Sequence, residues 1–420
     1  MAVLIIGAGI AGLTTALSLH QIGVDCRVFE SVDTIEPLGV GINTLPHAVR
    51  ELTELGLADR LAATAIPTAE LAYYSKRGQP IWSEPRGLAA GYNWPQFSIH
   101  RGELQTILLD AARERLGADR IVTGHHLAAW ETTPQGVRAF FVERRSGRAI
   151  GDAAGELLIG TDGIHSAVRG RLYPDEGPPL WNGAILWRGV TVGTPFLTGR
   201  SMIMAGHEFQ KFVCYPISRA AMGRDEAVIN WIAERKFKPD HRWRREDWNR
   251  RGNLQDFLPQ FEAWRFDWLD VPGLIRAAGH CYEYPMVDRN PLDQWTFGPV
   301  TLLGDAAHPM YPIGSNGASQ AILDARVLAR EIRAHGATPA ALLAYEDERR
   351  PATGAIVLAN RRNGPEQVMQ AVEERAPDGF ARIEDVLSAE ELQEAAAGYK
   401  RIAGFDREAL NNRAPIVTGR

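Results

Sequence analysis

The sequence predicts an α/β protein with a Rossmann-like domain, a second domain built on a mixed antiparallel sheet, and C-terminal helices. The first observation is the N-terminal segment VLIIGAGIAG, in which an apolar run leads into closely spaced glycines. The second is the stretch from about 174 to 284, where apolar and polar residues alternate as in a sheet with one covered face. The third is a series of helical patterns after about residue 318.

Length, charge and cysteine content set the limits on function. At 420 residues the chain is too long for one compact core. Its composition, with 45% hydrophobic and 23% charged residues, is typical of a globular protein. A net charge of -5 gives no reason to expect nucleic acid or an anionic membrane as partner. The three cysteines lie far apart in the sequence, which predicts no metal site and suits a reducing cytoplasm. The sequence also shows no basic leader and no apolar run long enough to span a membrane, so we expect a cytoplasmic protein.

The first element is a strand, a glycine turn and a helix. Gly7 suits the tight turn, Gly9 leaves room for a pyrophosphate, and Gly12 lets helix and strand pack closely. The helix N-terminus would meet the phosphates with free N–H groups. A second strand over 24–29 ends at Glu30, which is placed to bind a ribose diol. The pattern predicts an adenosine diphosphate site and does not distinguish FAD from NAD.

Two later segments also join a strand to a helix. Asp162 follows the short apolar strand 157–160, and Arg169 lies on the next helix. Asp162 would face a ligand at the carboxyl end of its strand or, alternatively, cap the helix. Asp305 follows the buried strand 300–303 and could bind a ribityl or ribose hydroxyl.

The loop after Asp305 leads to a long helix. Pro312 stiffens the loop, and Gly314, Asn316 and Gly317 open the helix from about Ala318. Its N-terminus could stabilise negative charge on a reduced flavin. Because the three segments are about 150 residues apart in one order, we expect them to form a single FAD site.

With these motifs the chain resembles the class A flavoprotein aromatic hydroxylases, which include para-hydroxybenzoate and salicylate hydroxylases. The resemblance covers nearly the whole chain. It implies that the first motif holds the adenosine half of FAD, that the second serves the pyrophosphate and NAD(P)H, and that the third holds the ribityl chain and flavin. It adds Arg101, in SIHRGELQ, as an arginine that reaches FAD. The cofactor-binding residues expected are Gly7, Gly9, Gly12, Glu30, Gly41, Arg101, Asp162, Arg169, Asp305, Gly314, Asn316 and Gly317.

Further strings narrow the resemblance within that family. LGVGIN at Leu38–Asn43, which contains Gly41, LWRGVT at Leu186–Thr191 and MYPIGSNGASQAILDA at Met310–Ala325 are similar to phenazine-modifying members that replace a ring carboxylate by a hydroxyl. These strings lie mostly around the expected cofactor, so the similarity does not identify the substrate. The resemblance is weakest after about Arg362.

The domain layout follows from the motifs and the alternating stretch. We expect an FAD-binding domain in three parts (1–72, 100–174, 285–362), a substrate domain (73–99, 175–284) and a C-terminal helical tail (363–420). In the tryptophan-rich sheet of the substrate domain, Trp187, Tyr215 and Trp231 are candidates to line a substrate pocket, although aromatic residues in a sheet usually belong to its core. Thr338 and Pro339 are expected to open a helix over 340–359, and a capping box at Ser388–Glu391 another.

The resemblance implies an NAD(P)H- and O2-dependent monooxygenase that hydroxylates an aromatic or N-heteroaromatic substrate through a flavin C4a-hydroperoxide, with or without decarboxylation. Pro312 and Gly314, at the flavin face, are the candidates for shaping the reacting site. Since no second Gly-x-Gly-x-x-Gly is found, NADH or NADPH would bind transiently. We expect a monomer or homodimer. The alternatives are a reductase or halogenase of the same fold, or an FAD-holding redox sensor without turnover.

Overall fold

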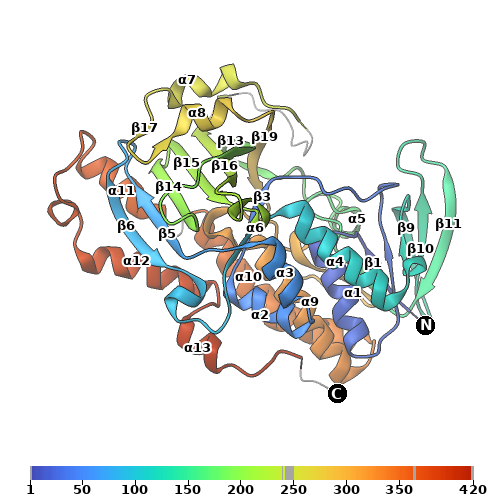
Figure 1. Cartoon of the computed structure of the whole chain (residues 1–420). Coiled ribbons are helices and arrows are strands. Elements are labelled where there is room, and N and C mark those ends of the chain that lie inside the picture. The colour runs from blue at the N-terminus through green and yellow to red at the C-terminus, as the bar shows by residue number, and fades with distance from the viewer. Residues whose placement is uncertain (1, 239, 242–249, 363–365, 418–420) are drawn as a thin grey trace.

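The protein is built around two sheets that lie side by side, with long helices beneath them (Figure 1). The structure is a computed structural model, and it describes residues 2–238, 240–241, 250–362 and 366–417. Among the helices of this described part, none is long and apolar enough to cross a membrane. The same residues contain no group of three His, Cys, Asp or Glu side chains that could hold a metal ion.

The smaller of the two sheets is parallel and has five strands in the order β20-β12-β1-β2-β8. Its central strand is the predicted apolar N-terminal segment, and all four of its residues are buried. A strand covered on both faces must be apolar along its whole length, as this one is. The strands are β1 (Val3–Ile6), β2 (Cys26–Phe29), β8 (Ile121–Val122), β12 (Leu158–Gly160) and β20 (Val300–Leu302).

Helix α1 (Ile10–Gln21) packs against both α4 (Arg101–Leu116) and α9 (Gly317–His335) on one side of this sheet. A three-stranded antiparallel sheet covers the other side, and Phe141 of that sheet stacks on Phe29 with ring centroids 4.4 Å apart. Its strands are β9 (His126–Thr133), β10 (Gly136–Val142) and β11 (Ala149–Gly155). The sequence analysis did not anticipate β11, whose alanines and glycines carry little strand preference.

The larger sheet has seven strands in the order β19-β13-β16-β15-β14-β5-β6. Neighbours are antiparallel except β14 and β5, which run parallel. The alternating stretch therefore forms an antiparallel sheet, as predicted, and strands from residues 70–85 extend it. The strands are β5 (Glu70–Tyr74), β6 (Pro80–Pro85), β13 (Leu180–Gly193), β14 (Ser201–His207), β15 (Gln210–Pro216), β16 (Ala227–Lys236) and β19 (Cys281–Asp288).

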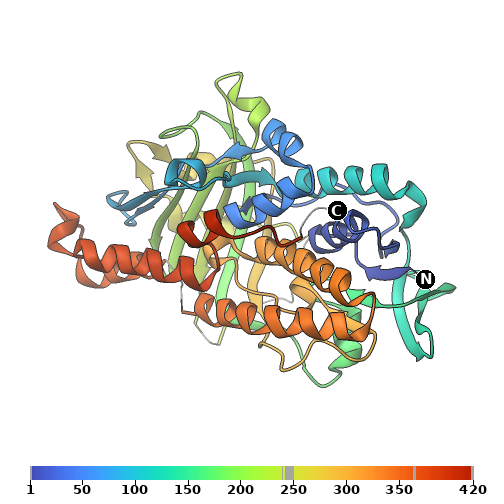
Figure 2. The same ribbon diagram turned by 90° about the horizontal axis from the view of Figure 1, so that it is seen from below.

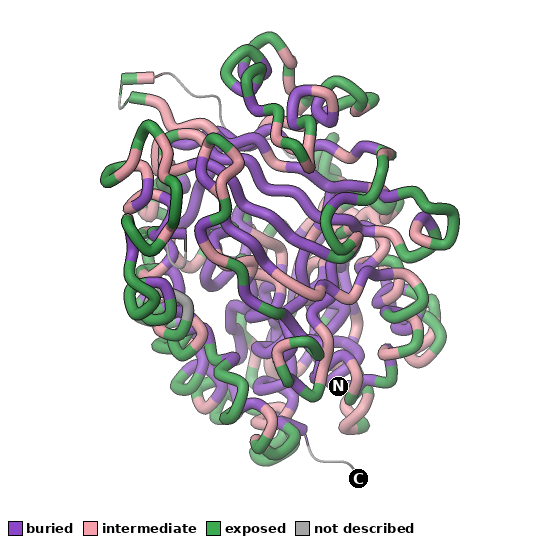
Figure 3. Tube along the Cα trace, turned by 60° about the vertical axis from the view of Figure 1, so that its left-hand side comes forward, coloured by how far each residue is buried: buried purple, intermediate pink, exposed green. Residues whose placement is uncertain are grey.

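Both faces of the larger sheet are covered, so its strands are buried along most of their length (Figure 3). Short helices α7 (Leu258–Phe261) and α8 (Val271–Arg276) pack on the outer face. The inner face turns toward the FAD-binding part of the chain and the C-terminal tail. The remaining short elements in this half are α6 (Arg219–Met222), β17 (Arg265–Phe266) and β18 (Leu269–Asp270).

A small antiparallel sheet, in the order β3-β7-β4, stands between the two large ones. Its strands are β3 (Gly41–Thr44), β4 (Ile66–Pro67) and β7 (Phe97–His100). Helices α2 (Pro46–Glu54) and α3 (Ala58–Thr64) connect β3 to β4.

The C-terminal part is helical and extends along the underside of the molecule (Figure 2). Helix α10 (Pro339–Asn360) begins after Thr338 with a proline in its first turn, and α12 (Ala389–Ile402) begins with the predicted capping box of Ser388 and Glu391. Val368 and Leu392, from α11 (Gln367–Arg375) and α12, pack on the inner face of the larger sheet, and α13 (Arg407–Asn412) follows.

Candidate cofactor and active site

The three predicted motifs meet at one edge of the parallel sheet. Strands β1, β12 and β20 are parallel neighbours, and each motif begins where one of these strands ends. Ligands of open α/β sheets bind at the carboxyl ends of the strands. The fold thus brings together segments that are far apart in the sequence.

Gly7 and Gly12 fit the first motif against the second. A Cβ on Gly12 would lie 1.9 Å from the Gly7 carbonyl oxygen and 2.7 Å from the Thr161 hydroxyl. Thr161 donates a hydrogen bond of 2.7 Å to the Ile6 carbonyl. Gly7, at a φ of +105°, also lies too close to Thr161 for a side chain. These contacts account for the first and third glycines by protein packing alone.

Gly9 behaves differently from its neighbours. No atom of the described residues lies within 4 Å of a Cβ built on Gly9, so its glycine is not required by packing. It precedes α1, whose first turn presents N–H groups to the same open space. Glu30, after the second strand, contacts the glycine turn: its carboxylate accepts a hydrogen bond of 2.8 Å from the Ala8 N–H.

In the second motif, Asp162 binds the first turn of helix α5 (Ala167–Leu172), whose N-cap residue is Ser166. Its carboxylate accepts hydrogen bonds from the Ser166 hydroxyl and from the Ala167 N–H, the latter at 2.7 Å. Burial raises the pKa of this carboxyl, and the hydrogen bonds act in the opposite direction. This is the capping role that the sequence analysis kept as an alternative.

Arg169 ties the second motif to the third. It is 1% exposed and donates to the carbonyl oxygens of Ala306 and Ala307, at 3.0 and 2.8 Å. Its guanidinium also forms an ion pair with Glu176. The side chain is thus committed to the backbone directly after Asp305 and to Glu176, and its 1% exposure leaves it little surface for a ligand.

Asp305 and Arg101 are accessible charged side chains that lie close enough to influence each other's pKa. Both side chains are exposed to solvent, yet they stand among enough protein to shift their pKa values. Burial raises the pKa of the Asp305 carboxyl while His308 and Arg101 lower it, and burial lowers the pKa of Arg101. Gly317, at the start of α9, lies beside Asp305, 3.9 Å from its carboxylate to a Cβ built on the glycine.

Gly41 lies where the small sheet meets the larger one. Its N–H donates to the Asn230 side chain at 2.7 Å, and its carbonyl accepts from Arg188 at 2.7 Å. A Cβ on Gly41 would lie 2.5 Å from that of Asn230. Tyr215 shares a hydrogen bond with the same Arg188 and therefore lies on the inner face of the larger sheet.

The loop 312–317 carries both predicted flavin-face residues. Pro312 is exposed and Gly314 half-buried, and Gly314 and Ser315 have φ values of +69° and +55°. A Cβ on Gly314 would lie 2.1 Å from the Tyr399 hydroxyl oxygen. That hydroxyl lies 3.1 Å from the Ile313 carbonyl, so the C-terminal tail fixes the loop from behind.

Asn316 and His47 are buried beneath this loop rather than exposed to a ligand. The Asn316 side chain accepts from Gln320 at 3.0 Å, and Gln320 lies 3.4 Å from His47. Burial, with help from Arg413 and Arg349, lowers the pKa of His47 to about 3. His47 is thus neutral in the folded protein at neutral pH.

We expect this histidine to make the folded protein sensitive to acid. Below pH 6.5 the unfolded chain binds a proton on His47 that the folded chain does not bind. Stability should therefore fall as the pH drops from 6.5 toward 3, by up to about 1.4 kcal/mol per pH unit, and should not change through His47 above 6.5. Urea unfolding at pH 7.5 and 5.5 tests this prediction: the loss of stability should be smaller in His47→Gln than in the wild type. Equal losses would contradict it.

Trp187 and Trp231, two of the three substrate candidates, lie on the outer face of the larger sheet. Both are at most 2% exposed, and Trp187 stacks on Phe257 at 4.7 Å. The Trp231 ring N–H donates to Thr191 at 3.0 Å. The structure places them in the core beneath α7 and α8, away from loop 312–317, which is the usual place of aromatic residues in a sheet.

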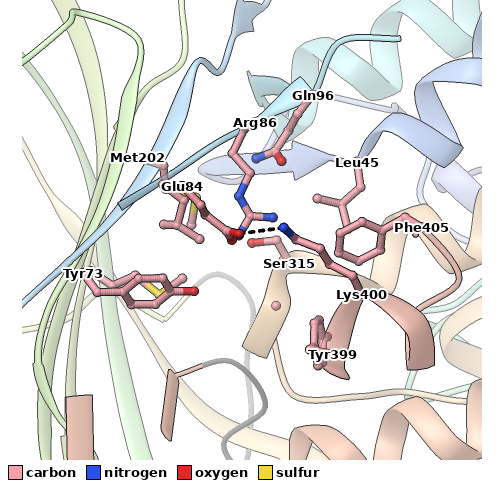
Figure 4. A pocket seen from close by; sticks show the side chains of 13 residues that line it. Leu45, Tyr73, Glu84, Arg86, Gln96, Met202, Ser315, Tyr399, Lys400 and Phe405 are labelled. Atoms are coloured by element: carbon pink, nitrogen blue, oxygen red, sulfur yellow. Dashed lines mark hydrogen bonds and ion pairs between the residues drawn. The ribbon is translucent and has the colours of Figure 1, made fainter. Parts of the chain in front are cut away.

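A pocket between the inner face of the larger sheet and loop 312–317 contains residues that the sequence analysis did not single out. Arg86 follows β6, Tyr73 comes from β5, and Lys400 comes from the tail (Figure 4). No local motif marks these side chains. The one available signal was the expectation that 73–99 belongs to the substrate domain, because alternate residues of a strand there would turn toward the FAD-binding part of the chain.

Comparison with known families identifies the fold. The family model described as an FAD binding domain matches residues 1–231 and 283–359. The chain therefore belongs to this family of FAD-binding proteins. The tail after residue 359 lies outside the match.

Individual relatives indicate the kind of enzyme. The chain is 49% identical over 361 residues to phenazine 1,6-dicarboxylic acid hydroxylase PhzS of Lysobacter antibioticus, covering 86% of this chain and 89% of the relative. It is 32% identical over 396 residues to 3-amino-4-hydroxybenzoate 2-monooxygenase PtnB3 of Streptomyces platensis, covering 91% and 93%. HpxO of Klebsiella pneumoniae, solved with FAD and uric acid, superposes with a TM-score of 0.72 at 24% identity, covering 98% and 95%. The predicted fold class and the prediction of a flavoprotein aromatic monooxygenase are confirmed.

The geometry fits FAD. Three features lie along the same sheet edge: the open space in front of Gly9, the accessible Asp305 and the uncapped N-terminus of α9. Among the described residues Asn316 makes no side-chain bond to the first turn of α9, which leaves these N–H groups available to an anion. Gly9 and Glu30 would hold the adenosine diphosphate half, and Asp305 with the α9 N-terminus the ribityl and ring half.

Proposed function

We propose that the protein hydroxylates an N-heteroaromatic carboxylic acid of the phenazine type, consuming NADH or NADPH and O2. The observation that carries this proposal is the 49% identity to a phenazine 1,6-dicarboxylic acid hydroxylase over most of both chains. A second relative is named for an aminohydroxybenzoate, also an aromatic acid. The proposal includes a cytoplasmic enzyme that acts as a monomer or homodimer.

FAD reduced by NAD(P)H supplies the chemistry that activates O2. The residues of this chain would bind and orient the reactants. Asp305 and the N-terminus of α9 would fix the flavin, and loop 312–317 would set the distance between flavin and substrate. Leu71, Met202 and Met204, on the inner face of the larger sheet, would keep water from the reacting atoms.

Displacement of a ring carboxylate balances in atoms and electrons. The acid, O2, NADH and a proton give the phenol, carbon dioxide, water and NAD+. Hydroxylation without displacement consumes the same oxidant and reductant, retains the carboxylate and replaces a ring hydrogen. The product mass therefore distinguishes the two reactions.

The test uses the purified holoenzyme with phenazine-1-carboxylate, phenazine-1,6-dicarboxylate, 3-amino-4-hydroxybenzoate and urate. We expect a phenazine acid to stimulate NAD(P)H oxidation and O2 uptake together. The product should lose about 28 mass units if the carboxylate is displaced, or gain about 16 if it is retained. NAD(P)H oxidation that no aromatic acid stimulates would contradict the proposal and favour a redox sensor. Turnover independent of O2 would favour a reductase.

A further inference from the structure

The pocket between loop 312–317 and the inner sheet face has mixed walls. Leu71, Met202 and Met204 form an apolar side on β5 and β14, and Leu45 with Phe405 forms another. Gly314 and Ser315 close the end next to the expected flavin. The chemistry of these walls suits a flat aromatic ring, since the thioethers and rings offer apolar contact without fixed polar demands.

Three buried polar atoms in this pocket have no hydrogen-bond partner among the residues described. They are the Tyr73 hydroxyl, the Arg86 Nε and the Gln96 Oε1. The three side chains are 2%, 8% and 2% exposed. A buried polar atom without a partner costs stability, so such a cluster indicates groups that a ligand satisfies. Figure 4 shows the Tyr73 hydroxyl and the Arg86 guanidinium directed into the space between the walls.

The charges of the pocket do not balance. Glu84 is the acceptor for both cations: it forms an ion pair with Arg86 and another with Lys400, whose Nζ lies 2.6 Å from its carboxylate (Figure 4). The side chains lining the pocket thus carry two positive charges and one negative charge. The nearby Glu366 is paired with Lys211, outside this set. An excess cation with unused donors in a mostly buried site favours an anionic ligand.

We propose that Arg86 and Lys400 anchor the carboxylate of the aromatic substrate, and that Glu84 occupies this anchor when substrate is absent. The inference rests on the proposed function for the identity of the ring. The guanidinium of Arg86 offers several N–H donors in one plane, which suits a carboxylate. Lys400 belongs to α12, outside the residues that the family model matches, so the C-terminal tail sets the preference for acids.

The experiment measures binding separately from turnover. Phenazine-1-carboxylate and its uncharged amide are titrated into the holoenzyme, and their dissociation constants are obtained from the change in flavin absorbance. We expect Arg86→Gln and Lys400→Met each to weaken binding of the acid by about tenfold or more, with a much smaller effect on the amide. Glu84→Gln should tighten binding of the acid, because it removes the competing carboxylate.

All three substitutions disturb the same ion pairs, so structural damage alone would weaken acid binding in each variant. An anchor instead predicts weaker binding in Arg86→Gln and Lys400→Met and tighter binding in Glu84→Gln. Lys76→Met is the matched control: it breaks the 2.5 Å ion pair between Lys76 and Glu373, which also links the sheet side to the tail but lies outside this pocket. FAD content and the thermal midpoint show that each variant is folded. Equal losses for acid and amide, or weaker acid binding in Glu84→Gln, would overturn the proposal.

Failure of the anchor and failure of the proposed function give different results. If the wild type converts the phenazine acid but the variants bind acid as tightly as before, the function stands and the anchor is wrong. If the wild type binds only 3-amino-4-hydroxybenzoate, and Arg86→Gln abolishes that binding, the anchor stands and the phenazine substrate is wrong. A wild type that binds none of these acids overturns the anchor.

Discussion

Replacing Gly9 by valine should yield a folded protein that lacks its yellow cofactor. A Cβ at this position meets no atom of the described residues within 4 Å, and the backbone, at φ −76° and ψ −173°, is extended and open to any residue. The side chain would instead fill the space at the start of α1 where the pyrophosphate must approach. We expect the affinity for FAD to fall by about tenfold to a hundredfold, the penalty of crowding a packed site.

Two other glycines serve as controls. Gly12→Ala puts a Cβ 1.9 Å from the Gly7 carbonyl oxygen and should lower stability as well as FAD affinity. Gly170→Ala, in α5, meets no described atom within 4 Å and should change neither. Thermal unfolding of the apoproteins and titration with FAD separate the two effects. A Gly9 variant that retains FAD with wild-type affinity would place the pyrophosphate elsewhere.

The parts of the site that could be predicted from sequence are those with local patterns. The motif with Gly7, Gly9 and Gly12 could be predicted because its glycines follow an apolar strand and open a helix at a fixed local spacing. The helix after Thr338 and the capping box at Ser388 were predicted for the same reason, since a helix start depends on its first turn. That the three motifs meet follows from a general rule for parallel sheets.

The rest depends on which face of an element turns inward. Trp187 and Tyr215 lie on two strands of the same sheet, β13 and β15. Composition does not reveal that Trp187 faces α7 while Tyr215 faces Arg188. Arg169 illustrates a second limit on prediction from the sequence. A basic residue beside a phosphate-binding motif can donate hydrogen bonds to backbone carbonyls as readily as to a phosphate. Lys400 and Glu84 are 316 residues apart and meet only through the tail.

Arg169→Met should be the most destabilising single change in the site outside the glycines. In the structure Arg169 is nearly fully buried and satisfies the carbonyls of Ala306 and Ala307 while it pairs with Glu176. Methionine keeps similar bulk and removes every donor, so two buried carbonyls lose their partner. Among the described residues, Glu176 would then retain its ion pair with Arg289 alone. We expect a loss of about 3–5 kcal/mol in the free energy of unfolding.

The same substitution should also weaken FAD binding, although Arg169 itself is nearly fully buried. The two carbonyls directly follow Asp305, so releasing them frees the segment that positions its carboxylate. Arg171→Met is the matched control, because Arg171 lies on the same helix but is exposed, with its guanidinium 5.2 Å from the Trp130 ring. It should change stability by no more than about 1 kcal/mol. If Arg169→Met binds FAD normally at a temperature where it is fully folded, the arginine supports the fold alone, and Asp305 is held by its own strand and helix.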